Sequence, residues 1–383
     1  MVGEAEVRSA LEGVEEPELR LPMVDLGMVT GVAVDGDTAV VAVALPLAGD
    51  ERAQAVHGVV AEAVLAATDA RRVEVDLREM TEDEKAATAR VLKGQVPAKP
   101  ANPLAVIDAH AAHHPPPRRN PFTDSATRVL AIASGKGGVG KSSVTTNLSI
   151  ALAQRGHRVA ALDADVWGFS MPRMLGIRNP PDLIDDVIVP PESYGVHLIS
   201  MGFFASEEQA VIWRGPMLHK ALEQFLTDVH WADPDFLVID MPPGTGDVSL
   251  SMAQFLPRAE VVIVTTPQLA AQRVAQRAAA MAEKVELQLT GVIENMSWFR
   301  GDDGKRYELF GAGGGAELAA QLEVPLLAQI PLVPALREGG DDGHPIVIAH
   351  PDDEASVAFR AVAERLDTEL TPKRIYRPEL KIN

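Results

Sequence analysis

Two lysines lie within one glycine-rich stretch of the chain, and their types and spacing point to phosphate chemistry. The stretch VLAIASGKGGVGKSSVTTNLS covers residues 129–149. The spacing G-x-x-x-x-G-K-[ST] of a phosphate-binding loop is met by Gly135, Gly140, Lys141 and Ser142. Such a loop needs one lysine, at the position of Lys141, so Lys136 requires a separate explanation.

Each residue type in this loop has a chemical task. Glycines allow positive φ angles and let backbone N–H groups approach phosphate oxygens, and the following helix adds its dipole. We expect Lys141 to reach the β- and γ-phosphates of ATP and the Ser142 hydroxyl to coordinate Mg²⁺. The predicted nucleotide-contacting run is Gly135, Lys136, Gly137, Gly138, Val139, Gly140, Lys141, Ser142 and Ser143.

Acidic residues end two further apolar runs. AALDADVWGFSMP carries Asp163 and Asp165, and FLVIDMPPGTGD carries Asp240. Carboxyl ends of parallel strands meet at the ligand-binding edge of a sheet. We expect one of the first two carboxylates to hold the attacking water and the other to support Mg²⁺, with Asp240 as the Walker B aspartate. Gly244 is a candidate donor to the γ-phosphate, whereas Asp247 is predicted to cap a helix.

These residues require strands and helices that bring them to one place. From Thr127 onward, short apolar runs such as RVLAIAS, FLVIDM and VVIVTT alternate with helical segments. A strand over 128–134 and a helix over 141–155 should flank the phosphate loop. The alternation predicts an α/β class: a doubly wound, mostly parallel sheet.

The chain divides into four parts. Residues 1–93 combine helical spacing, two apolar runs joined by DGD and the capping-box signal TEDE, and they predict a small α+β domain. Residues 94–126 form a proline-rich linker, whose histidines are interpreted as solvated rather than metal-binding. The P-loop domain then spans 127–371, and a mildly basic tail covers 372–383.

Composition excludes several classes of function. The 383 residues include 35 Lys and Arg against 54 Asp and Glu, a net charge of −19. Such a charge disfavours nonspecific binding to nucleic acid or to an anionic membrane. The chain has no cysteine, which excludes disulfides and thiolate chemistry. Without a signal-like apolar core or a run long enough to span a bilayer, we expect a cytoplasmic protein.

The form GKGGVGK resembles the deviant Walker A motif of the MinD/ParA/NifH class. Five further segments extend a resemblance to the Mrp/ApbC family of P-loop ATPases, which are iron–sulfur cluster carriers: IWRGPM (212–217), VIDMPPGTGDV (238–248), VTTPQ (264–268), VIENMS (292–297) and IPLVPALREGGDDGHPIV (330–347). The segment VEEPELRLPMVDLGMV (14–29) is similar to the small domain often fused to these ATPases.

The resemblance implies a slow ATPase that works as a homodimer, in which Lys136 acts in trans on the partner's nucleotide. It makes Asp165 the water-positioning acid and Asp240 the Walker B acid, so that the implied catalytic residues are Lys136, Asp165 and Asp240. Ser142, Asp163 and Asp240 are the implied Mg²⁺ site. The implied partners are client or iron–sulfur assembly proteins.

The resemblance also implies a base pocket. Asn295 would contact the adenine, and the segments 266–268 and 331–338 would line the pocket, with Pro267 and Pro331 as its candidate residues. Only the family pattern indicates a functional role for Glu294, Trp213 and Arg214. The alternative roles, packing at an interface or a salt bridge at the start of a helix, stay open for these three residues.

The chain departs from the family where the cargo would bind. In cluster-carrying relatives a C-x-x-C-G follows ENMS, so that two chains supply four thiolates to one cluster. Here Arg300 and Asp303 stand at the two cysteine positions, with Gly304 retained. Arginine cannot ligate iron, and clusters are held by thiolates with histidine as an occasional partner. The GDDG turn is interpreted as a solvated hairpin rather than a hard-cation site.

Three functions therefore stay open. The first is an Mrp/ApbC-like ATP-binding and ATP-hydrolysing protein of iron–sulfur cluster assembly that has ATP and Mg²⁺ as cofactors and lacks cluster ligands of its own. The second is a positioning ATPase of the ParA/MinD type. The third is an ATP-gated dimeric scaffold for partner proteins.

Overall fold

The computed structural model describes residues 2–47, 49–94, 120–204, 215–244, 247–370 and 372. Most of the predicted linker and tail lies outside this part of the chain, as do Trp213 and Arg214. Contacts divide the chain into two compact units. Unit 1 consists of residues 1–118, 181–189 and 228–232, and unit 2 contains the remainder. Residues 181–189 and 228–232 thus group with the N-terminal part, although they lie within the segment that we assigned to the P-loop domain.

Unit 1 is built on a three-stranded sheet of order β1-β2-β3. β1 and β2 pair antiparallel, β3 runs parallel to β2, and β6 and β7 form a separate hairpin. Apolar side chains of the sheet and of α2 share one buried cluster with Ile184, Val187 and Val189 of that hairpin. The elements are α1 (Glu4–Leu11), β1 (Val29–Asp35), β2 (Thr38–Leu45), α2 (Asp50–Ala67), β3 (Arg72–Glu79), α3 (Glu82–Leu92), β6 (Asp182–Ile184) and β7 (Val187–Val189).

The capping box predicted from TEDE is confirmed at the start of α3. Thr81 Oγ1 accepts a hydrogen bond from Glu84 N, and Thr81 N donates to Glu84 Oε2 at 2.8 Å. Both terminal nitrogens of the Arg78 guanidinium also donate to the Glu84 carboxylate, at 2.7 and 2.8 Å. The Arg78 hydrogen bonds, together with those from Thr81, lower the pKa of Glu84 to about 2.

Unit 2 is built on an eight-stranded sheet of order β15-β12-β11-β4-β10-β5-β9-β8. All neighbours pair parallel except β8, which is antiparallel to β9. The order reverses around β4, with β10 on one side and β11 on the other, so the predicted doubly wound, mostly parallel sheet is confirmed. The strands are β4 (Arg128–Ala133), β5 (Val159–Asp163), β8 (Glu192–Ser193), β9 (Val196–Ser200), β10 (Phe236–Asp240), β11 (Glu260–Thr265), β12 (Gln288–Glu294) and β15 (Leu326–Gln329), with a separate hairpin of β13 (Phe299–Arg300) and β14 (Arg306–Tyr307).

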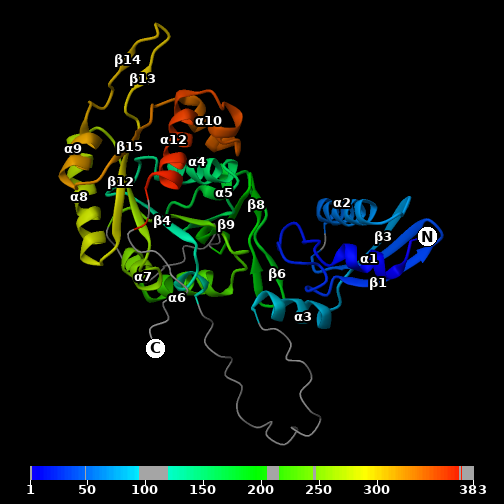
Figure 1. The fold of residues 1–383 in the computed structure, drawn as a ribbon. Coiled ribbons are helices and arrows are strands. Elements are labelled where there is room, and N and C mark those ends of the chain that lie inside the picture. The colour runs from blue at the N-terminus through cyan, green and yellow to red at the C-terminus, as the bar shows by residue number, and fades with distance from the viewer. Residues whose placement is uncertain are drawn as a thin grey trace, which may run out of the picture. The chain divides into compact units, whose positions relative to one another are not determined.

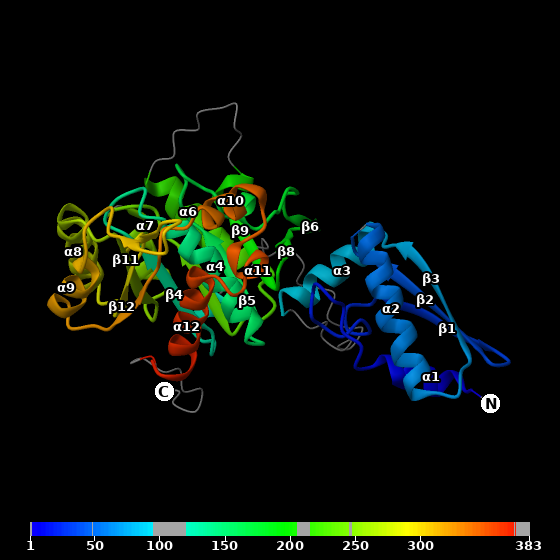
Figure 2. The same ribbon diagram turned by 90° about the horizontal axis from the view of Figure 1, so that it is seen from above.

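Helices cover both faces of this sheet. Figures 1 and 2 show α4 and α12 packed side by side over one face, and Figure 1 shows α6 and α7 on the opposite side. Leu148 and Leu152 of α4 and Phe359 of α12 are fully buried against Ile132 and Val238 in one aliphatic core. The helices are α4 (Lys141–Gln154), α5 (Met171–Met174), α6 (Gly215–Asp228), α7 (Asp247–Phe255), α8 (Leu269–Lys284), α9 (Gly314–Gln321), α10 (Pro334–Asp342), α11 (Ile346–Ala349) and α12 (Glu354–Thr368), with short 3₁₀ turns at Pro121–Thr123 and Met201–Phe203.

Strand register brings the acidic residues to one level of the sheet. Asp240, the last residue of β10, pairs with Asp163 of β5 on one side and with Ile132 of β4 on the other. The phosphate loop begins at Gly135, three residues after Ile132. Both carboxylates therefore lie beside the loop at the carboxyl edge of the sheet.

Candidate nucleotide site

The phosphate loop connects β4 to α4, and two of its glycines have left-handed backbones. Gly138 has φ +77° and Gly140 has φ +80°. A Cβ on Gly140 would lie 2.2 Å from Asn295 Nδ2, and a Cβ on Gly135 would lie 2.2 Å from the Val274 backbone in α8. A side chain at either position would therefore displace the loop from its supports. Helix α4 begins at Lys141, directly after the loop.

Three side chains of α4 converge on the Asp240 carboxylate. Lys141 Nζ lies 2.5 Å from Asp240 Oδ1, and Ser142 Oγ donates to Asp240 Oδ2 at 2.5 Å. Thr145 Oγ1 donates to Asp240 Oδ1 at 3.1 Å and to Lys141 O at 3.0 Å. Thr145 is not part of the predicted nucleotide-contacting run, but it contacts the same carboxylate as Lys141 and Ser142. Lys141, Thr145 and Asp240 are buried and Ser142 is half-buried, so the lysine, two hydroxyls and one carboxylate form a single polar group at the base of the loop.

The two aspartates after β5 have different surroundings. Asp163 is fully buried, and its carboxylate accepts hydrogen bonds from the backbone of Ser170 and Met171 and from Ser200 Oγ. Burial and the neighbouring Asp240 carboxylate raise the pKa of Asp163. These contacts favour a role in holding the segment after β5, rather than the predicted support of Mg²⁺.

Asp165 faces the cavity above the loop. Its Oδ2 lies 3.8 Å from Lys141 Nζ, while its Oδ1 is buried and has no hydrogen-bond partner in the described part of the chain. Burial raises the pKa of Asp165, against the effect of Lys141 and with the effect of Asp240. An unpaired buried carboxylate oxygen is costly unless a ligand or water satisfies it. Its place suits the predicted contact with an attacking water.

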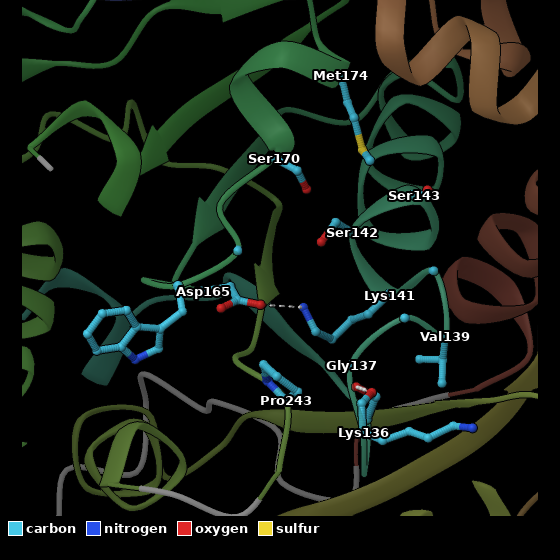
Figure 3. A pocket seen from close by; sticks show the side chains of 15 residues that line it. Lys136, Gly137, Val139, Lys141, Ser142, Ser143, Asp165, Ser170, Met174 and Pro243 are labelled. Carbon is cyan, nitrogen blue, oxygen red and sulfur yellow. Dashed lines mark hydrogen bonds and ion pairs between the residues drawn. The ribbon is translucent and has the colours of Figure 1, made fainter. Parts of the chain in front are cut away.

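A cavity of about 360 Å³ lies over the phosphate loop. In Figure 3 the Ser142 and Ser170 hydroxyls and the Lys141 side chain surround it, with a dashed line joining Lys141 to Asp165. Most of the predicted loop residues line it, as does Asp165. Six lining residues were not predicted: Ser134, Trp167, Gly168, Ser170, Met174 and Pro243. Four of them lie within ten residues after Asp165, where we assigned chemistry to the carboxylates alone.

The two loop lysines extend in opposite directions. In Figure 3 Lys141 points across the cavity toward Asp165, whereas the Lys136 side chain leads away from both residues. Lys136 Nζ donates to Gln268 Oε1 at 3.2 Å. Gln268 belongs to the segment 266–268 that we assigned to the base pocket.

The predicted base-pocket residues do not line the cavity. Asn295 is buried, and its Nδ2 donates to Val139 O at 2.8 Å. This side chain therefore holds the backbone of the phosphate loop. Pro267 and Pro331 are both buried. Glu294, which we left open, accepts from Gly315 N at 2.5 Å and from Gln329 Nε2 at 2.7 Å, so it fixes the start of α9.

The switch-like turn after Asp240 also makes a contact within the protein. Gly244, predicted as a donor to the γ-phosphate, has φ +94° and donates its N–H to Ser134 O at 3.0 Å. Helix α7 begins at Asp247 itself. This hydrogen bond therefore ties the turn to Ser134, the first residue after β4.

The hairpin β13–β14 holds the two residues that stand at the cysteine positions, and Figure 1 shows it projecting from the body of unit 2. Arg300 forms an ion pair with Glu354, at the start of α12, and donates to Gly304 O at 2.9 Å. Trp298 Nε1 donates to the same carboxylate at 3.3 Å, and Arg306 stacks over the Trp298 ring at 4.1 Å.

Asp303 lies in the turn of this hairpin. It accepts hydrogen bonds from Lys305 N at 3.0 Å and from Tyr307 Oη at 2.9 Å, and these bonds lower its pKa. Across the described ranges, no group of three or more His, Asp or Glu residues is placed to hold a metal ion. At the two positions where the resemblance implies cysteines, Arg300 is thus engaged in an ion pair with Glu354 and Asp303 in hydrogen bonds within its own turn.

Comparison with known proteins places these features in a family. A family model described as a NUBPL iron-transfer P-loop NTPase matches residues 125–367, and a second, described as an iron–sulfur cluster assembly protein, matches residues 4–77. An iron–sulfur cluster carrier protein of Mycobacterium tuberculosis is 42% identical over 95% of this chain and 93% of its own length. The chain belongs to the iron-transfer P-loop NTPase family. The resemblance predicted from its motifs is confirmed.

More distant relatives share this family and fold. Iron–sulfur cluster carrier proteins of Synechocystis and Helicobacter pylori are 37% and 34% identical, over 94% and all of this chain and 96% of their own lengths. A nucleotide-binding protein from Archaeoglobus fulgidus in complex with ADP superposes with a TM-score of 0.53 at 32% identity, over 61% of this chain and 91% of its own.

The septum site-determining protein MinD from Pyrococcus horikoshii, complexed with Mg-ADP, gives a TM-score of 0.50 at 28% identity, over 63% of this chain and 96% of its own. The family member described here therefore shares the P-loop NTPase fold with nucleotide-bound proteins. Within its described residues, no helix combines the length and apolarity that crossing a bilayer requires.

Proposed function

We propose that this chain hydrolyses ATP slowly as a homodimer and uses the resulting cycle in iron–sulfur protein maturation, with cluster ligands supplied by a partner. The observation that carries the ATPase proposal is the convergence of Lys141, Ser142 and Thr145 on Asp240, beside a cavity into which Asp165 faces. The maturation role is supported by family membership and by the names of the relatives.

The residues at the loop fit a nucleotide triphosphate with Mg²⁺. Oxygen ligands are those that Mg²⁺ prefers, and the Ser142 hydroxyl and Asp240 carboxylate offer two of them within one hydrogen bond of each other. The left-handed glycines and the start of α4 present backbone donors to phosphate oxygens. When bound, Mg²⁺ would neutralise charge on the phosphates.

The reaction itself requires positioning and charge more than covalent chemistry. Lys141, now paired with Asp240, would be the residue that holds the β- and γ-phosphates, and the Ser142 hydroxyl would be one of the oxygens that hold Mg²⁺. Asp165 holds a water by its Oδ1, which has no hydrogen-bond partner among the described residues. The raised pKa of Asp165 lets this carboxylate accept a proton more readily than an exposed aspartate.

Lys136 supplies the second positive charge from another copy of the chain. Lys136 is among the residues that line the cavity, but its side chain leads away from its own chain's Lys141 and Asp165 (Figure 3) and its ammonium contacts Gln268. A lysine that reaches a partner's nucleotide would couple turnover to dimer closure. Self-association is thus part of the proposed catalytic cycle.

A cluster does not fit the hairpin residues of this chain. Arg300 has no lone pair for iron and is committed to Glu354, and Asp303 is committed to its own turn. We therefore assign cluster ligation to a thiolate-bearing assembly protein and assign to this chain the nucleotide-driven step. The side chains of this chain do not bind the cluster in this scheme.

Phosphate release by the full-length protein tests the ATPase step. We expect turnover with ATP and Mg²⁺ that is lost in Lys141→Ala, and faster cluster arrival at an apo iron–sulfur enzyme when a cluster-loaded assembly protein is also present. Phosphate release no faster than that of Lys141→Ala would refute the ATPase proposal. Cluster transfer unaffected by the protein and ATP would refute the maturation role alone.

The hairpin network favours a second candidate, an ATP-gated scaffold for partner proteins. Ion pairs from Arg300 and Arg306 to Glu354 make the projecting hairpin a preformed surface for protein contact. A scaffold would bind ATP and dimerise without measurable hydrolysis, so phosphate release separates the two candidates. A positioning ATPase of the ParA/MinD type would pellet with DNA or with vesicles of anionic lipid, which the charge of −19 disfavours.

A further inference from the structure

We propose that Gln268 is the positioning residue for Lys136: its side-chain oxygen holds the Lys136 ammonium away from its own chain's phosphate cavity, so that the lysine is available to a second copy. This inference rests on the proposed function, because it specifies how the in-trans lysine is controlled. Lys136 Nζ donates to Gln268 Oε1 at 3.2 Å. The contact joins the phosphate loop to the start of α8.

The orientation of the Gln268 amide is fixed by a second donor. Thr266 Oγ1 donates to the same Gln268 oxygen at 3.0 Å, and Thr266 is 3% exposed. Because both an ammonium and a hydroxyl donate to this atom, the amide oxygen and not its NH₂ group must face Lys136. Thr266 therefore holds Gln268 in the orientation that accepts Lys136.

The backbone around Gln268 is fixed relative to the phosphate loop. A Cβ on Gly135 would lie 2.2 Å from the α8 backbone at Val274, and a Cβ on Gly314 would lie 2.2 Å from Pro267 O. Gln272 Nε2, one turn into α8, donates to Gly314 O at 2.5 Å. The loop and the first turns of α8 are thus packed backbone to backbone. This packing fixes the distance between Gln268 and Lys136.

A neutral amide suits this task better than a carboxylate. It accepts a hydrogen bond from the ammonium but adds no opposite charge, so the lysine can leave when another anion is near. The adjacent Leu269 is 67% exposed and presents an apolar side chain beside the contact. A second copy that covered Leu269 would approach Lys136 at the same time.

A double-mutant cycle tests the inference in the full-length protein. We expect Gln268→Glu to reduce kcat for ATP at least tenfold while KM and ADP affinity change less than about twofold, because the ion pair retains Lys136. Raising the salt concentration should restore part of kcat, since the pair is partly exposed. Gln268→Ala should reduce kcat several-fold. In the Lys136→Ala background both changes should alter kcat less than about twofold.

Gln276→Glu is the matched control, because it adds the same charge two turns along α8 and should leave kcat unchanged. Equal fractional losses with and without Lys136 would overturn the inference, since a merely structural role for Gln268 does not depend on the lysine. A wild-type kcat in Gln268→Glu would overturn it as well.

A measurement independent of turnover separates this inference from the proposed function. The rate at which acetic anhydride labels Lys136, followed by mass spectrometry of its peptide, should rise in Gln268→Ala and fall in Gln268→Glu. If the protein proved unable to hydrolyse ATP, these rates would still decide whether Gln268 holds Lys136. Unchanged labelling in both variants would refute the inference even in an active ATPase.

Discussion

The Lys141 ammonium lies 2.5 Å from the Asp240 carboxylate, and both side chains are buried at the carboxyl edge of the sheet. One comes from the first residue of α4 and the other from the last residue of β10. Their charges compensate each other in a place where neither could remain alone. The pair therefore links the stability of the loop to the chemistry that the loop performs.

Lys141→Ala should lose nucleotide binding and also destabilise the protein. The lost charge-assisted hydrogen bonds to phosphate are worth about 1.5–3 kcal/mol, or roughly tenfold or more in Kd. Asp240 would remain buried without its partner, at a cost of about 3–5 kcal/mol to the free energy of unfolding. Calorimetric titration with ADP and urea denaturation measure the two effects. Unchanged ADP affinity would remove the phosphate-loop assignment.

Lys136→Ala should separate binding from turnover. Since Lys136 contacts Gln268 and not the buried group at Asp240, ADP affinity and urea stability should stay close to wild type. Turnover should fall, because a charge supplied across an interface in the transition state can be worth ~10³–10⁵ in rate. Phosphate release at saturating ATP is the measurement. A variant with normal kcat would contradict the in-trans role.

Much of this site was predictable because its signals are local. The strand and helix flanking the loop were expected at 128–134 and 141–155, and they occur at Arg128–Ala133 and Lys141–Gln154. Asp240 ends an apolar run, and a parallel strand that ends in an aspartate places it at the ligand edge.

The contacts of the Gln268 and Asn295 side chains could not be predicted in this way. Each side chain contacts a loop more than 130 residues away, at Lys136 and Val139 respectively. Sequence spacing carries no information about which backbones approach so closely, as Gly135 does to α8. The same holds for Arg300 and Glu354, which are 54 residues apart.

Anaerobic incubation with iron and sulfide should give no stable cluster absorbance on the purified protein. The chain has no thiolate, and Arg300 and Asp303 are engaged within the hairpin and with α12. The double variant Arg300→Cys/Asp303→Cys is the positive control, and we expect it to bind iron as a dimer. A cluster spectrum from the wild-type chain would contradict the assignment of ligation to a partner.

Acid should weaken the contribution of Glu84 to the stability of unit 1. Its pKa is about 2 in the folded protein and near 4.3 in the unfolded chain, so the folded state favours the ionised form. This contribution is complete above about pH 5 and is lost as the pH falls toward 2. Glu84→Gln keeps an acceptor for the capping box but loses the charge facing Arg78. The difference in unfolding temperature between the two proteins should therefore shrink from pH 6 to pH 2.5, and a constant difference would contradict this account.

The chain passes between its two units four times in the interval from residue 180 to residue 233, after residues 180, 189, 227 and 232. The first of the two segments that return to unit 1, residues 181–189, carries three apolar side chains. These are Ile184, Val187 and Val189, and they are buried with residues from the first hundred positions. Deleting the N-terminal 118 residues would therefore leave three apolar side chains of the remaining protein in water. A gene truncation that removes the small domain would therefore not leave a well-packed P-loop unit, and a shortened natural version should carry compensating polar residues at these three positions.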